Sequence, residues 1–306
     1  MVTNLNPASE LFLSQLGRVQ DKLARAEREI SSGKRITVAS DAPDEVEPLL
    51  QLRAAQRHNS QVQSNLTLAK TDADTADSSL ASSIQILDRA LALANQGASS
   101  TVDAAGRQSL AEEADSLLEQ IVTQSRTTVQ GRYIFSGNAP DLPAYAIDST
   151  SPGGIAQVSA APANCRIEGP GRTSFLASKN AQEIFALQNA NGTPASGNVF
   201  AALNELRDAL RNDDAAAVGT AIGSLRAASA YLNAMEGFYG TVQNRVSDAV
   251  DAAGKYDTQL QTQLSQAEDA DVVSASLEMT QASTQLQAAF QMQAKLPRTS
   301  LFDYLG

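Results

Sequence analysis

Apolar residues recur at alternating steps of three and four along most of the first 130 residues, and this heptad spacing constrains the fold more than any other feature. One seam starts at Leu52 and keeps its phase until Gly97. Its members are Ala55, Asn59, Val62, Leu66, Ala69, Ala73, Ala76, Leu80, Ser83, Leu87, Ala90 and Ala94. A helix of this length is not stable alone in water, so the seam predicts helical partners along it.

Two further helices are expected on either side of this seam. The first has a seam of Leu5, Ser9, Phe12, Leu16, Val19, Leu23, Ala26 and Ile30, and it should end near Ser32 with Gly33 as its C-cap. Ser40 or Asp41 is then suited to cap the long helix. The other helix follows Gly106 and shows Leu110, Ala114, Leu117, Ile121 and Gln124 at the same spacing.

The character of the chain changes between Gly131 and Asn198. This stretch holds six of the ten prolines and eight of the eighteen glycines, too many for long helices. Short strands are expected at Tyr133–Phe135, Ile155–Val158 and Cys165–Ile167. A helix then runs from Val199 to Val250, and a last helical pattern runs from Leu260 through Val272 to Phe290.

The predicted fold class is therefore mainly α with a β-rich insertion: a long antiparallel coiled-coil bundle built from both termini, and a small outer β domain. The N-terminal and C-terminal helices must lie side by side, because neither can bury its seam alone. Five parts are expected: an N-terminal assembly helix (1–40), the first half of a helical core (41–130), the β-rich outer domain (131–198), the second half of the core (199–264) and a C-terminal assembly helix (265–306).

Charge and hydropathy exclude several classes of function. The formal charge is −11 and the pI is near 4.6, whereas nucleic-acid binding draws its affinity from clustered Lys and Arg. The sequence has no apolar run of about 18 residues, so no membrane span is expected. Met1–Glu10 lacks a basic region followed by an apolar run, so no cleaved signal peptide is expected either.

The sequence does not predict a catalytic, cofactor-binding or metal site. His58 is the only histidine and Cys165 the only cysteine, and neither lies near a partner for nucleophilic chemistry. Two groups of acids lack the turn glycine of a calcium loop and suit helix starts instead. These groups are Asp41, Asp44, Glu45 and Glu47, and then Glu268, Asp269 and Asp271. We therefore expect a structural protein rather than an enzyme.

Four strings resemble motifs of the bacterial flagellin superfamily. Ser31–Ile36, followed by Ser40–Pro43, is similar to the signature between its first two helices, and Gly131–Gly137 looks like the exit from the helical domain in its hook-associated branch. Ala267–Asp271 resembles the acidic entry to the last helix. Ser300–Leu305 is similar to the ending typical of members at the junction between hook and filament.

The resemblance implies a structural subunit of the flagellum, exported without a cleaved signal and assembled outside the cell as a ring between hook and filament. It also implies partners: further copies of the chain, an adjacent hook-associated junction protein, flagellin and an export chaperone, with no nucleic acid and no membrane. Two alternatives remain open at this point. One is a minor filament flagellin, and the other is a surface binding or adhesin module that displays its middle region to a ligand.

The seams at the two ends of the chain are the predicted assembly interface, because they are more amphipathic than a central domain requires. The predicted interface residues are Leu5, Phe12, Leu16, Val19, Leu23, Ile30, Val272, Met279, Leu286, Phe290, Leu301, Phe302, Tyr304 and Leu305. We expect Leu286 and Phe290 to be largely exposed in the monomer, and the terminal residues to be mobile until they dock.

Overall fold

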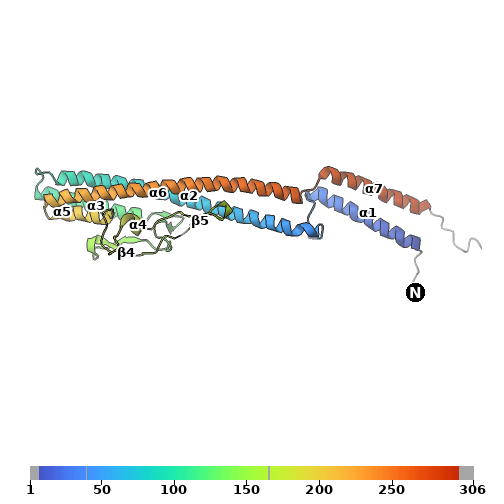
Figure 1. Ribbon diagram of the computed structural model, residues 1–306, viewed down its shortest axis with the longest axis horizontal. Coiled ribbons are helices and arrows are strands. Elements are labelled where there is room, and N and C mark those ends of the chain that lie inside the picture. Colours follow the sequence, from blue (N-terminus) through green and yellow to red (C-terminus); the bar gives the residue numbers. More distant parts are fainter. Residues whose placement is uncertain (1–6, 39, 165, 296–306) are drawn as a thin grey trace, which may run out of the picture. The chain divides into compact units, whose positions relative to one another are not determined.

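The computed structural model describes residues 7–38, 40–164 and 166–295, which are mostly helical, as predicted (Figure 1). The helices are α1 (Pro7–Ser32), α2 (Pro43–Gly97), α3 (Ala104–Ser125), α4 (Ala181–Phe185), α5 (Val199–Arg211), α6 (Ala215–Glu268) and α7 (Val272–Lys295), with short 3-10 helices η1 (Pro152–Gly154) and η2 (Pro170–Arg172). The described residues form two compact units: one comprises residues 59–256, and the other combines residues 7–58 with 257–295.

Within the unit of residues 59–256, α2 and α6 form the long helical core. From Asn59 onward every member of the predicted α2 seam is buried. α6 buries every seventh residue in the same way: Val218, Leu225, Leu232, Tyr239, Val246 and Ala253. The Asn59 Nδ2 donates to the carbonyl oxygen of Ala253 at 3.0 Å. The beginning of the α2 stretch therefore lies beside the end of the α6 stretch, and the two helices are antiparallel.

The prediction of one continuous helix after Val199 is wrong, because α5 ends at Arg211 and α6 begins at Ala215. Asp213 has a φ of 55°, a left-handed conformation that ends a helix. Asp214 then caps the next helix, since its Oδ1 accepts from the amides of Ala216 and Ala217 at 3.0 Å each. The last helical pattern is interrupted too, between Glu268 and Val272.

The predicted β-rich insertion consists of three antiparallel hairpins rather than one sheet. They pair β1 (Thr128–Val129) with β2 (Arg132–Tyr133), β3 (Tyr145–Ile147) with β4 (Ile155–Gln157), and β5 (Arg166–Glu168) with β6 (Ser174–Leu176). β2 stops before Phe135, whereas the sequence predicted a strand over Tyr133–Phe135. Cys165 lies outside the described residues.

Aromatic side chains bind the hairpins to the helices. The Phe135 ring packs edge-on against Phe185 and Tyr239, with centroid distances of 5.8 and 6.4 Å, and Tyr145 packs against Phe200 at 4.9 Å. Burial raises the pKa of the Tyr145 hydroxyl to about 12. These rings belong to the core, so they do not offer a stacking platform to a ligand of the outer surface.

Candidate assembly interface

α1 and α7 lie side by side and run in opposite directions (Figure 1). The fully buried apolar side chains of this pair are small: Ala26, Ala275 and Ala282. The larger apolar side chains of α1 and α7 are at most half-buried. The pair therefore leaves much of its apolar surface uncovered.

The predicted interface residues on α1 and α7 fall into three groups. Phe12, Leu16, Val19, Leu23, Ile30, Met279 and Leu286 are half-buried, and Val272 and Phe290 are exposed. Leu5, Leu301, Phe302, Tyr304 and Leu305 lie outside the described residues. The expectation that Leu286 is largely exposed is wrong, because α7 packs against α1 within one chain and partly covers the seam.

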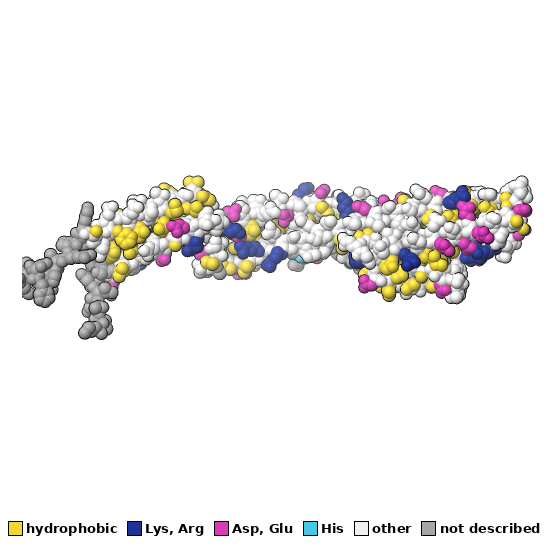
Figure 2. Space-filling model, turned by 180° about the vertical axis from the view of Figure 1, so that it is seen from behind, with side chains coloured by type: hydrophobic (Ala, Val, Ile, Leu, Met, Phe, Trp, Pro, Cys, Tyr) yellow, Lys and Arg dark blue, Asp and Glu magenta, His cyan; other side chains and the backbone are white. Residues whose placement is uncertain are grey.

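The sequence prediction did not include several apolar residues of this helix pair that the structure exposes. Of the fourteen large apolar side chains that are exposed in the described residues, seven lie on α1 and α7. They are Leu11, Leu13, Val272, Val273, Leu277, Phe290 and Met292. Figure 2 shows hydrophobic side chains gathered over these helices. Most of them lie outside the heptad positions, so a search for one seam overlooks them. Exposed large apolar residues concentrated on one pair of helices are typical of surfaces that contact another chain.

The connector that follows α1 and the connector that precedes α7 are hydrogen-bonded to each other. Gly33 follows α1 with a φ of 70°, as predicted for its C-cap, and its carbonyl oxygen accepts from the amide of Ala270 at 2.9 Å. The amide of Arg35 donates to the carbonyl oxygen of Glu268 at 2.7 Å. The strings that carry the sequence resemblance near residues 33 and 268 thus meet as a short antiparallel bridge.

A buried carboxylate holds this bridge. The Glu268 side chain is 2% exposed and forms ion pairs with Lys34 and with the Arg53 Nη2, the latter at 2.8 Å. Burial alone would raise the pKa of Glu268, but the two cations more than offset it and keep the pKa below its ordinary value. One side chain therefore joins the end of α6, the connector after α1 and the first turns of α2.

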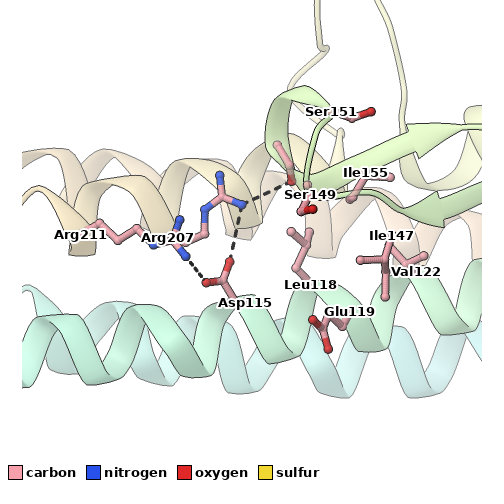
Figure 3. A pocket seen from close by; sticks show the side chains of 12 residues that line it. Asp115, Leu118, Glu119, Val122, Ile147, Ser149, Ser151, Ile155, Arg207 and Arg211 are labelled. Atoms are coloured by element: carbon pink, nitrogen blue, oxygen red, sulfur yellow. Dashed lines mark hydrogen bonds and ion pairs between the residues drawn. The ribbon is translucent and has the colours of Figure 1, made fainter.

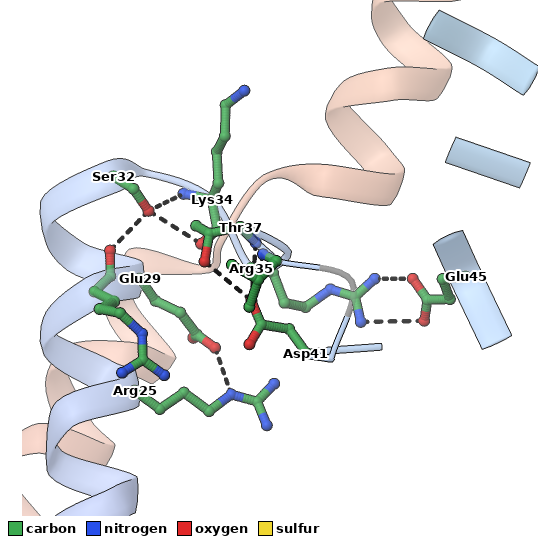
Figure 4. Close-up of polar contacts among 10 residues, drawn as sticks. Arg25, Glu29, Ser32, Lys34, Arg35, Thr37, Asp41 and Glu45 are labelled. Carbon is green, nitrogen blue, oxygen red and sulfur yellow. Dashed lines mark hydrogen bonds and ion pairs between the residues drawn. The ribbon is translucent and has the colours of Figure 1, made fainter. Parts of the chain in front are cut away.

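Arg35 and Asp41 order the connector between α1 and α2 (Figure 4). Arg35 makes a two-pronged ion pair with Glu45, with Nη1 to Oε1 at 3.1 Å, and its Nη2 also donates to the carbonyl oxygen of Ala267 at 2.9 Å. The amides of Val38 and Thr37 donate to Asp41 and lower its pKa. The motif around residues 31–43 therefore serves to fix backbone geometry.

The acidic residues near the start of α7 also accept local hydrogen bonds that fix the backbone. Asp269 accepts from the Ser265 hydroxyl, and Asp271 caps α7 by accepting from the amides of Val273 and Ser274 at 3.0 and 3.2 Å. In residues 7–38, 40–164 and 166–295, no three His, Cys, Asp or Glu side chains gather as metal ligands do. Nor is any helix of that described part long and apolar enough to span a bilayer.

Fold and motifs together define a structural subunit of the flagellin type. The chain matches the family model for the bacterial flagellin N-terminal helical region over residues 3–139, and the model for the C-terminal helical region over residues 216–305. Together these two matches cover well over half of the sequence. The chain belongs to the bacterial flagellin superfamily. None of the curated proteins matches it significantly in sequence.

Solved structures of flagellar hook-associated proteins share the fold. A Vibrio parahaemolyticus protein assigned to this class is 19% identical, with a TM-score of 0.63 over 75% of this chain and 100% of its own. Hook-associated protein 3 of Legionella pneumophila is 12% identical, with a TM-score of 0.60 over 71% and 98%. FlgL of Bacillus cereus is 18% identical, with a TM-score of 0.54 over 69% and 97%. At these identities the likeness concerns the fold alone.

Proposed function

We propose that this protein is a subunit that joins the hook of the bacterial flagellum to its filament, and that α1 and α7 carry the contacts with neighbouring subunits. The observation that supports this most is the uncovered apolar surface of the α1–α7 pair. Exposed side chains such as Leu277 and Phe290 contribute to assembly only when another chain covers them.

The proposed interface combines the half-buried seam with the exposed apolar residues of the same helices. Antiparallel helices with partly open seams pack into larger bundles by placing further helices against the remaining apolar stripe. In this proposal residues 1–40 and 265–306 are the assembly segments, residues 41–130 and 199–264 form the helical core, and residues 131–198 form the outer domain.

The likeness to hook-associated proteins supports the same set of partners. They are further copies of this chain in a ring, an adjacent hook-associated protein, flagellin, and a chaperone that holds the C-terminal helix before export. The protein then acts outside the cell, after export without a cleaved signal, and has a structural rather than an enzymatic role. The superfamily to which the chain belongs consists of structural proteins.

The position of labelled protein on intact flagella tests this proposal. A junction subunit should give one short zone of label at the filament base. Label along the whole filament would refute the junction role and favour a minor flagellin. Label that is absent from flagella but present elsewhere on the surface would favour a binding module instead.

A further inference from the structure

A cavity of about 440 Å³ lies between α3, α5 and the β3–β4 hairpin (Figure 3), and its arginines are paired within the chain. Arg207 binds Asp208 through both Nε and Nη2, and Asp115 pairs with Arg207 and with Arg211. The two cations are thus satisfied by acids of α3 and α5, and the cavity presents no open positive charge to a ligand. A reactive group lies elsewhere in the same unit, in the loop between α4 and α5.

This loop carries Asn191 and Gly192 at its tip. The base of the loop is fixed, because Gln188 pairs with Pro194 as an antiparallel β-bridge. Asn191, Gly192 and Thr193 are all exposed, so water reaches them freely. They also contain the only Asn–Gly step in the sequence.

An Asn–Gly step reacts with itself in water. The backbone nitrogen of the glycine attacks the side-chain Cγ of the asparagine, and the N–Cγ bond forms while the Cγ–Nδ2 bond breaks. The proton of the glycine nitrogen leaves with Nδ2 as ammonia, and the product is a cyclic imide. Water then opens the imide at either carbonyl carbon and gives aspartate or isoaspartate. Glycine favours the ring closure, because it has no Cβ to crowd the attacking nitrogen.

The turn activates the side-chain carbonyl of Asn191. Its Oδ1 accepts from the Thr193 hydroxyl at 2.7 Å and from the Thr193 amide at 3.2 Å. The Thr193 hydroxyl itself accepts from the Asn189 Nδ2 at 3.1 Å, so a chain of hydrogen bonds polarises the carbonyl. Negative charge collects on Oδ1 as the nitrogen adds to Cγ. Two donors aimed at this oxygen stabilise that charge in the way of an oxyanion hole.

The two atoms that must bond lie within one small hydrogen-bonded turn. The ring closed by the bond from the Thr193 amide to the Asn191 Oδ1 contains both the Asn191 Cγ and the Gly192 nitrogen. The Gly192 amide donates to the carbonyl oxygen of Asn189 at 2.9 Å, and this bond must open before the nitrogen attacks. Hydrogen bonds in exposed turns open at small cost in free energy. The turn therefore holds the reactants together without locking them.

We propose that Asn191 is a site of spontaneous deamidation, which needs only water and which Thr193 promotes. In the isoaspartate product the Cβ of residue 191 joins the backbone and lengthens it between Asn189 and Thr193. The amide of Asn189 donates to the carbonyl oxygen of Thr193 at 2.8 Å, and the added atom displaces this pair. The modification thus opens the loop and adds a carboxylate to it. This inference is independent of the junction role, because it concerns neither α1 nor α7.

Incubation of the folded full-length protein at neutral pH, followed by peptide mass spectrometry, tests the proposal. Asn191 should be converted to aspartate and isoaspartate, whereas Asn189, which precedes Ala190 in the same loop, should stay unchanged over the same time. Thr193→Val removes the hydroxyl donor but keeps the side-chain shape. It should slow the reaction about threefold to tenfold, the effect of one neutral hydrogen bond. Thr193→Ser keeps the hydroxyl and should react at the wild-type rate.

Two more measurements separate the contribution of the turn from that of the Asn–Gly step. In urea, where the turn is lost, the wild type and Thr193→Val should deamidate at equal rates, and a difference as large as in the folded protein would overturn the role of the turn. Hydroxylamine attacks the imide and should cleave the folded chain after Asn191, so an intact chain would overturn the imide route. Equal deamidation of Asn189 and Asn191 would overturn the site, and an unchanged rate in Thr193→Val, shown to be folded by circular dichroism, would overturn the role of Thr193.

Discussion

Replacing Leu277 and Phe290 of α7 with aspartate should abolish assembly while leaving the monomer intact. In the structure these side chains are 60% and 52% exposed, so their substitution removes little packing within one chain. Full burial of a large apolar side chain is worth about 1.5–3 kcal/mol. The uncovered half of each side chain is therefore worth about 1–1.5 kcal/mol per subunit contact.

The two substitutions together should remove about 2–3 kcal/mol of apolar contact and add two carboxylates to a surface that must lose its water. Desolvating each unpaired charge costs a few kcal/mol more. Association should thus weaken by at least about a thousandfold, since each 1.4 kcal/mol is a factor of ten. Sedimentation velocity over a concentration series measures the association, and thermal melting followed by circular dichroism measures the monomer.

A matched control is available in the other unit. Leu142 is also 52% exposed, but it belongs to the β-rich region rather than to α1 or α7. Leu142→Asp should leave association unchanged. In cells, the double variant should be exported and found outside without filaments, whereas the control should support them. If the exported double variant still forms normal filaments, the helix pair is not the assembly interface.

Three further predictions concern stability. Gly137 has a φ of 58°, and a Cβ added there would lie 2.5 Å from a carbonyl oxygen, so Gly137→Ala should destabilise the fold by at least about 2 kcal/mol. Gly237 lies on the open face of α6, so Gly237→Ala should stabilise the fold by about 1 kcal/mol. Similar melting temperatures for the two variants would contradict this. The lowered pKa of Glu268 means that its stabilisation is complete above the ordinary Glu pKa of about 4.3 and is lost as the pH falls through the lower folded-state value. Acid unfolding of the unit of residues 7–58 and 257–295 should therefore be less steep in Glu268→Gln, and identical pH profiles would refute the ion-pair account. In the dilute monomer, limited proteolysis with mass spectrometry should show residues 1–40 and 265–306 cut before the middle of the chain, and equal resistance would refute the idea that the ends are held mainly by assembly.

The sequence predicted those parts of the fold that depend on local periodicity. The α2 seam from Asn59 to Ala94 is buried at every expected position, because a heptad pattern over many turns can face only one side of a helix. Gly33 was also predictable, because only a few residues tolerate the left-handed C-cap. The break at Asp213 was missed, although Asp213 stands seven residues after Leu206, where the seam requires an apolar residue, and the apolar spacing resumes one position out of phase at Val218.

The contacts that define the candidate interface were harder to predict. Glu268 pairs with Lys34 and Arg53, which are more than two hundred residues away, and no local pattern links an acid at the end of one helix to bases near the start of the chain. The exposed residues of α7 were missed for another reason. Val273 and Leu277 do not follow the spacing of Val272, Met279 and Leu286 and point away from that seam, so one periodic pattern could not account for both sets of residues.

The pairing of α1 with α7 and of α2 with α6 has a kinetic consequence. Each pair joins segments from opposite halves of the sequence, so neither can close until most of the chain has been synthesised, and closure of such long loops slows folding. α1 in particular has no partner until residues 272–295 exist. A protein that covers only α7 would therefore leave α1 without its partner as well. One binding event near one end would then keep both ends of the polypeptide from folding against each other.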